Sequence, residues 1–273
     1  MVRKLIKYDF RSYLRLLLPV QLILIGFAAF NRVIQFFEPV QGATTSSNVY
    51  STVFVSSLVL YIIAIIVCII MTVAVGIIRF YQGMYTNEGY LSHTLPVTPS
   101  QHIFAKLLTS VIFCLGTDLA VFLSFMVITA GDVNIEVFKA FFYLAQKYFE
   151  RLGANGAFYA LEAIVLLCVM VLHLFLQLYF CISVGQLAKK KKVLLAFGVY
   201  FGIYVVKQIL GTVFIIIQVM DYKWMQAIAK WIDLHLKASV HIFMCSDIVI
   251  TAVLALVYFL ISKYIMSKKL NLT

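Results

Sequence analysis

Long apolar stretches recur along this sequence, and they constrain its fold more than any other feature. Roughly 20 apolar residues are enough for a helix to cross the hydrocarbon of a bilayer. The stretches of that length cover residues 14–37, 51–78, 103–130, 158–187, 193–219 and 242–265. Only 12% of the residues are charged, about half the share found in soluble domains. We therefore expect an all-α integral membrane protein, a single transmembrane domain of six helices over residues 1–273.

The distribution of basic residues sets the expected orientation. The formal net charge is +11, and most lysines and arginines lie in the N-terminal segment, in 79–106, in the turn at 188–192 and in the C-terminal tail. Basic segments stay on the cytosolic side of a membrane. We therefore expect both termini in the cytosol and the protein in the cell membrane. The charge is explained by the anionic lipid surface, and we predict no nucleic-acid partner.

Three further segments have amphipathic patterns. Residues 2–15 place apolar residues on one helical face and basic residues elsewhere, which is typical of a helix in the membrane interface. A solvated N-terminal arm is the alternative. Residues 131–156 and 221–241 are predicted to be extracytoplasmic amphipathic segments, and the second holds both tryptophans of the chain. Tryptophan favours the membrane interface.

Several kinds of catalytic and binding site have no motif in this chain. The sequence contains no GxxxxGK[ST] nucleotide-binding loop, no HExxH zinc motif and no GxSxG nucleophile motif. The cysteines and histidines do not have the spacing of metal ligands. We therefore predict that the chain is not an enzyme and binds no cofactor or metal.

Two charged residues lie inside predicted spans at comparable depth, Asp118 in the third and Lys207 in the fifth. A charge in the hydrocarbon is costly unless it is paired or reached by water. One hypothesis is that both residues face the bundle interior and line or gate a translocation path. The other is a structural ion pair that fixes helix packing. His173, in the fourth span, is interpreted as a hydrogen-bonded packing residue, with a proton relay as the alternative.

The polar stretch 79–106, between the second and third spans, combines apolar side chains with turn-forming residues. Leu91 and Leu95 are interspersed with Gly89 and Pro96. This pattern indicates a short structured element that packs against a partner in the cytosol. The alternative is an ordinary loop whose apolar residues dip into the membrane interface.

The sequence NEGYLSHTLPVTPSQHIFAKLL, residues 87–108, resembles the "EGYL…TLPVS…(K/R)LL" segment of ABC-2-type permeases common in Gram-positive bacteria. The six spans and the N-terminal helix resemble the same family, that of the type V exporters. The resemblance implies a coupling helix that sits in a groove of an ATPase. In it, Gly89 and Pro96 would set the turns, Tyr90, Leu91 and Leu95 would pack in the groove, and Glu88 would meet a basic residue.

The resemblance also implies a function. The chain would be the permease subunit of an ATP-driven ABC exporter, paired with a second permease, identical or paralogous, and with ABC ATPase subunits that bind ATP and Mg²⁺. The cargo would be hydrophobic or amphipathic, such as a peptide. One alternative is a secondary transporter or channel that uses Asp118, Lys207 and His173. Another is a membrane-embedded enzyme or a scaffold.

Overall fold

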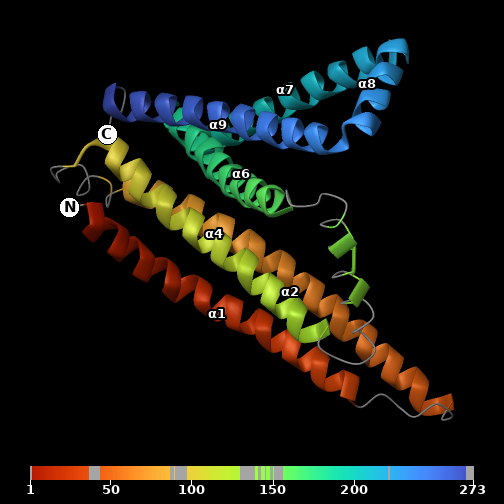
Figure 1. Ribbon diagram of the computed structural model, residues 1–273. Helices are drawn as coiled ribbons and strands as arrows, with labels where there is room; N and C mark the ends of the chain where they lie inside the picture. Colours follow the sequence, from red (N-terminus) through yellow and green to blue (C-terminus); the bar gives the residue numbers. More distant parts are fainter. Residues whose placement is uncertain are drawn as a thin grey trace. The chain divides into compact units, whose positions relative to one another are not determined.

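Long helices make up almost all of the computed structural model (Figure 1). It describes residues 2–36, 44–86, 89, 97–129, 139–140, 143–144, 146–147, 150, 156–220 and 222–268. These residues contain no strand, and six of their helices are long and apolar enough to cross a membrane. This confirms the predicted helical class with six long apolar helices, which indicate a multi-pass membrane protein. The chain divides into two compact units: Met1–Arg79 with Phe104–Arg151, and Phe80–Ile103 with Leu152–Thr273.

The first unit is built from three helices: α1 (Val2–Phe36), most of α2 (Thr44–Tyr85) and most of α4 (Pro99–Thr129). The predicted interfacial segment 2–15 is not a separate helix, because α1 continues through it and through Pro19. Tyr13 and Leu17 explain the continuity. Both are 1% exposed and belong to one apolar cluster, so the residues before and after the expected boundary pack in the same core.

A stripe of buried hydroxyl side chains on α4 holds this unit together. Its members recur every seven residues: Ser110, Thr117 and Ser124. A seven-residue repeat keeps one face of a helix turned toward its neighbours. In lipid, hydrogen bonds between helices and close approach of small residues replace the hydrophobic effect as the source of association. We call these three residues the hydroxyl stripe.

Each member of the hydroxyl stripe contacts a polar side chain of another helix. From α1, Tyr13 Oη lies 2.7 Å from the Ser110 hydroxyl, and Gln21 Nε2 donates to Thr117 Oγ1 at 3.0 Å. From α2, the Thr72 hydroxyl lies 2.9 Å from Thr117 Oγ1, and Tyr61 Oη lies 2.8 Å from the Ser124 hydroxyl. These bonds tie α1 and α2 to the same face of α4.

The second unit contains α6 (Gly156–Gly185), α7 (Lys192–Met220), α8 (Tyr222–Leu234) and α9 (Leu236–Lys268). Helix α6 packs against both α7 and α9. The last residues of α2 and the first residues of α4 belong to this unit as well. The predicted amphipathic segment 221–241 forms α8 and the first turn of α9, and Trp231 on α8 is exposed.

The basic turn between α6 and α7 is tight. A Cβ on Gly185 would lie 2.7 Å from the Cβ of Ala196 and 2.8 Å from the carbonyl oxygen of Lys192. No side chain fits there. Lys191 closes the turn with a φ of 57°, a left-handed conformation that costs about 1–2 kcal/mol for most residues.

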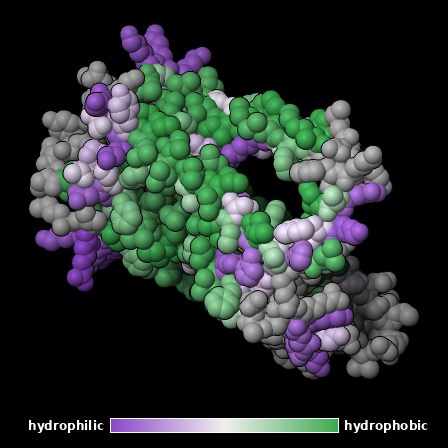
Figure 2. Space-filling model, turned by 45° about the horizontal axis from the view of Figure 1, so that its top comes forward, coloured by the Kyte–Doolittle hydropathy of each residue, from purple (hydrophilic) through white to green (hydrophobic). Residues whose placement is uncertain are grey.

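Apolar side chains cover the surfaces of the helices, whereas hydrophilic ones gather mainly toward the helix ends (Figure 2). Large side chains such as Phe197, Leu210 and Phe243 are 70%, 64% and 75% exposed. Apolar surface of this extent marks contact with lipid or a partner protein. Of the predicted outer segment 131–156, the residues described between 139 and 150 are all helical, and the rest of it before Gly156 lies outside the described residues.

Candidate functional site

The predicted coupling stretch, 79–106, is described at its two ends and at Gly89. Helix α2 continues to Tyr85, beyond the expected end of the second span at residue 78, and α4 begins at Pro99. The remaining residues predicted to contact an ATPase lie outside the described residues: Glu88, Tyr90, Leu91, Leu95 and Pro96. Their roles stay predictions.

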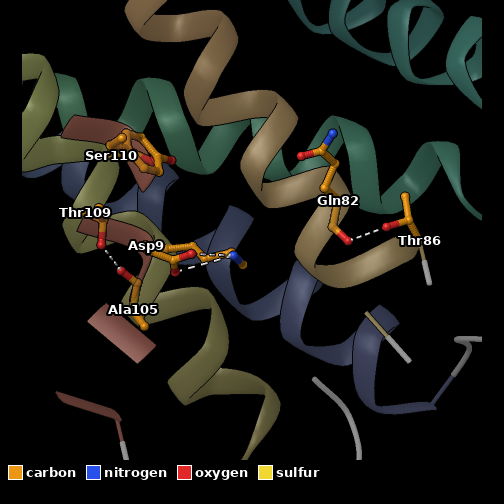
Figure 3. Close-up of polar contacts among 8 residues, drawn as sticks. Asp9, Gln82, Thr86, Ala105, Thr109 and Ser110 are labelled. Carbon is orange, nitrogen blue, oxygen red and sulfur yellow. Dashed lines mark hydrogen bonds and ion pairs between the residues drawn. The ribbon is translucent and has the colours of Figure 1, made fainter. Parts of the chain in front are cut away.

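Gly89 approaches the end of α2 very closely. Its backbone N–H donates to the carbonyl oxygen of Thr86 at 2.8 Å. A Cβ added to Gly89 would lie 2.6 Å from both the carbonyl carbon and the carbonyl oxygen of Met84. The Thr86 hydroxyl in turn donates to the Gln82 carbonyl at 2.6 Å (Figure 3). The chain can fold back on α2 in this way only with a glycine at position 89.

The end of α2 is anchored to α6 within the second unit. The rings of Phe80 and Tyr179 stack with centroids 3.8 Å apart and planes 8° from parallel, and both residues are fully buried. Tyr85 Oη donates to Ser183 Oγ at 2.8 Å. Ser183 Oγ donates to the Tyr179 carbonyl at 2.8 Å. We call these four residues the α2–α6 anchor. The anchor holds the end of α2 against α6.

Sequence reasoning missed the α2–α6 anchor. The available signal was the cluster of aromatic residues in α2 after the apolar span, Phe80, Tyr81 and Tyr85. Their rings are too large and too apolar for a simple solvated extension. Their partners on α6 could not be identified, since they lie about a hundred residues further along the chain.

A buried ion pair joins α1 and α4 in the first unit. Lys106 Nζ donates to Asp9 Oδ1 at 3.2 Å and to Oδ2 at 3.4 Å. The two side chains are 7% and 15% exposed. Figure 3 shows Asp9 beside the turn of α4 on which the Thr109 hydroxyl donates to the Ala105 carbonyl. Asp9 was identifiable as the one acidic residue in the basic segment 2–15.

Lys207, on α7, is held by two residues of α6. Its Nζ donates to Gln177 Oε1 at 2.8 Å and lies 3.1 Å from His173 Nε2. An ammonium group can only donate, so His173 Nε2 accepts and the neutral ring carries its proton on Nδ1. We call these three residues the Lys207 cluster. His173 is thus hydrogen-bonded, in agreement with the packing role predicted for it, and its partner is an intramembrane lysine.

Asp118, the other charged residue predicted inside a span, lies exposed on α4. Its carboxylate has no hydrogen-bond or ion-pair partner among the residues that the structure describes. Asp118 belongs to the first unit and Lys207 to the second. Their joint role, whether a lined path or a structural ion pair, stays a prediction.

A second polar contact within the second unit joins α6 and α9. His241 Nδ1 lies 2.7 Å from Glu162 Oε1 and 2.9 Å from Oε2. The ring of Tyr159 stacks on the His241 ring with centroids 4.0 Å apart. In the described part of the chain, no group of three or more metal-ligating side chains is arranged to hold a metal ion.

The described polar groups thus form two kinds of arrangement. The α2–α6 anchor and the Asp9–Lys106 pair connect helices at the two ends of the predicted coupling stretch, and such contacts can transmit a displacement. The Lys207 cluster places a positive charge within an apolar helix, where it can attract an anion. Comparisons of the chain with protein-family models, with curated proteins and with solved structures find no match.

Proposed function

We propose that this chain is the membrane-spanning permease subunit of an ATP-driven ABC exporter. The α2–α6 anchor is the observation that supports this most, because it connects the end of α2, at the start of the predicted coupling stretch, to another membrane helix. A chain without a nucleotide-binding loop of its own needs a mechanical contact if ATP is to drive it. The α2–α6 anchor connects the end of α2, where the ATPase would dock, to a second membrane helix.

In this proposal, ABC ATPase subunits bind ATP and Mg²⁺ and dock on the stretch 79–106. Movement of the stretch reaches Met84 through the close approach of Gly89. It continues through Phe80 and Tyr85 to α6. The cargo is hydrophobic or amphipathic, such as a peptide. A second permease, identical or paralogous, completes the transporter, and both termini face the cytosol.

Isolation of the chain from native membranes in mild detergent tests the proposal. We expect an ATP-binding protein to accompany the wild type and to be lost from Leu91→Asp/Leu95→Asp, since two carboxylates cannot enter an apolar groove. Leu187→Asp is the matched control, because Leu187 is an exposed apolar residue in the turn after α6. If no ATPase is recovered, or if the double variant retains it, the proposal is wrong.

One observation favours a second candidate, a secondary transporter or channel that uses Lys207, His173 and Asp118. The direct contact between Lys207 Nζ and His173 Nε2 places two proton-carrying groups together inside apolar spans. This candidate predicts proton-coupled transport by the chain alone in liposomes, lost in His173→Gln. Transport that requires ATP and a partner ATPase would exclude it.

A further inference from the structure

Among the described residues, the partners of Lys207 are the neutral side chains of Gln177 and His173. Helix α7 contains no aspartate or glutamate, α6 contains only Glu162, and α9 contains only Asp247. Glu162 contacts His241, and Asp247 lies one helical turn from Thr251, whose hydroxyl donates to it at 3.4 Å. No carboxylate of the described residues forms an ion pair with Lys207. Its positive charge is therefore uncompensated by α6, α7 and α9.

The position of Lys207 makes that charge costly. The candidate span of α7 is Lys192–Ile217. At about 1.5 Å per residue, Lys207 lies about 22 Å from its first residue and about 15 Å from its last. An ionisable side chain at such a depth normally pairs with another group or marks a path for a substrate. A counter-anion is thus expected at this point of the span.

The surroundings of Lys207 define the chemistry of that anion. Two of the three ammonium N–H groups have acceptors in Gln177 and His173, and the third has none among the described residues. The Gln177 amide nitrogen adds further N–H donors. Along α7, Tyr204 and Leu210 are 56% and 64% exposed. The charge therefore lies between apolar side chains, which can contact a hydrocarbon chain.

We propose that Lys207 and Gln177 bind the anionic group of an amphipathic molecule, a carboxylate or a phosphate, whose hydrocarbon part lies along α7. His173 holds the ammonium in place by accepting from it. As an assignment of cargo, this inference rests on the proposed function. A resident anionic lipid offers the same chemistry, so the test has to separate the two sources.

Binding of cis-parinaric acid, a fluorescent fatty acid, tests the site on the purified full chain in nanodiscs of zwitterionic lipid. A charged hydrogen bond contributes about 1.5–3 kcal/mol, so we expect the Kd to rise about tenfold or more in Lys207→Gln. Lys207→Arg should retain most of the affinity. Lys189→Gln is the matched control, since it removes a lysine charge from the turn before α7 and should leave the Kd unchanged.

Uncharged competitors provide a test that needs no variant. Dodecanoate and dodecyl phosphate should displace the probe from the wild type, and dodecanol and methyl dodecanoate should not. Equal displacement by the neutral compounds, or an unchanged Kd in Lys207→Gln, would overturn the proposal.

Loss of probe binding when the nanodiscs contain phosphatidylglycerol identifies a resident lipid as the source, and retained binding identifies a cargo. No ATPase is present, so failure here is distinguishable from failure of the ATPase isolation.

Discussion

At the scale of single residues, Gly89 is one of two described glycines, with Gly185, at which the backbone leaves no room for a Cβ. We expect Gly89→Ala to lose ATPase binding and about 1–3 kcal/mol of stability, because its Cβ would meet the Met84 backbone, which cannot rotate away as a side chain can. Gly26→Ala is the matched control, since no atom lies within 4 Å of its Cβ and alanine suits a helix interior. Isolation with the ATPase and thermal unfolding measure both effects. Equal behaviour of the two variants would contradict the prediction.

The Asp9–Lys106 pair makes a second prediction at this scale. Removing one member takes away the counter-charge of a largely buried group, which is destabilising. We expect Lys106→Met and Asp9→Asn each to lower the unfolding temperature of the detergent-solubilised chain markedly. The double variant should lose clearly less than the sum of the two. Additive losses would show that the carboxylate and the ammonium are not energetically coupled.

At the scale of helices, the α2–α6 anchor should carry coupling rather than ATPase binding. Tyr85→Phe removes the bond to Ser183 and should cost about 1 kcal/mol. We expect it to retain the ATPase but to weaken transport for each ATP hydrolysed. Tyr81→Phe is the control, because the Tyr81 hydroxyl has no hydrogen-bond partner within the described ranges. Loss of ATPase binding in Tyr85→Phe would place this residue in the docking surface instead.

The hydroxyl stripe is the corresponding element of the first unit. Thr117 contacts both Gln21 of α1 and Thr72 of α2, and hydrogen bonds between membrane helices contribute about 0.6 kcal/mol each, at most about 1.7. Thr117→Val should therefore cost about 1–3 kcal/mol in reversible unfolding. Thr212→Val should cost almost nothing, since its exposed hydroxyl bonds only within α7, to the Gln208 carbonyl. Equal losses would mean that the stripe does not join the helices.

Apolar runs are signals within one segment of the sequence, whereas contacts between helices join segments that are far apart. The six spans follow from apolar runs, so they could be predicted. Contacts such as Tyr13–Ser110 join positions 97 apart, and no periodicity within one segment selects such partners. The seven-residue repeat of Ser110, Thr117 and Ser124 was a signal in the sequence that sequence reasoning missed, and it could have indicated which face of α4 is buried. Residues 2–15 are helical, as predicted, but they continue into the first span without a break, because Tyr13 and Leu17 pack in one core. Their place at the membrane interface stays a prediction.

For the candidate site, the sequence identified charges but not their neighbours. Lys207 stood out because a lysine is rare inside an apolar span, and Asp118 was considered as its partner for the same reason. The partners that the structure shows, His173 and Gln177, lie one helical turn apart on α6. That spacing was available in the sequence. Their meeting with Lys207 depends on how α6 and α7 pack, which neither segment specifies alone.

At the scale of the whole molecule, the orientation in the membrane decides whether any ATPase can reach the stretch 79–106. Single cysteines and a membrane-impermeant maleimide measure it. Lys190→Cys tests the turn before α7, Tyr143→Cys the segment before α6, and Lys230→Cys helix α8. All three positions are exposed. The background is Cys245→Ala, which removes the one cysteine that is exposed.

Position 190 is separated from position 143 by α6 and from position 230 by α7, so each pair should lie on opposite sides of the membrane. The basic turn at 189–192 predicts that position 190 is cytosolic. We expect labelling at 143 and 230 in intact cells, and at 190 only after permeabilisation. Labelling of 190 together with 143 in intact cells would mean that α6 does not cross the membrane. Labelling of 190 alone would invert the topology and place the coupling stretch outside, beyond the reach of ATP.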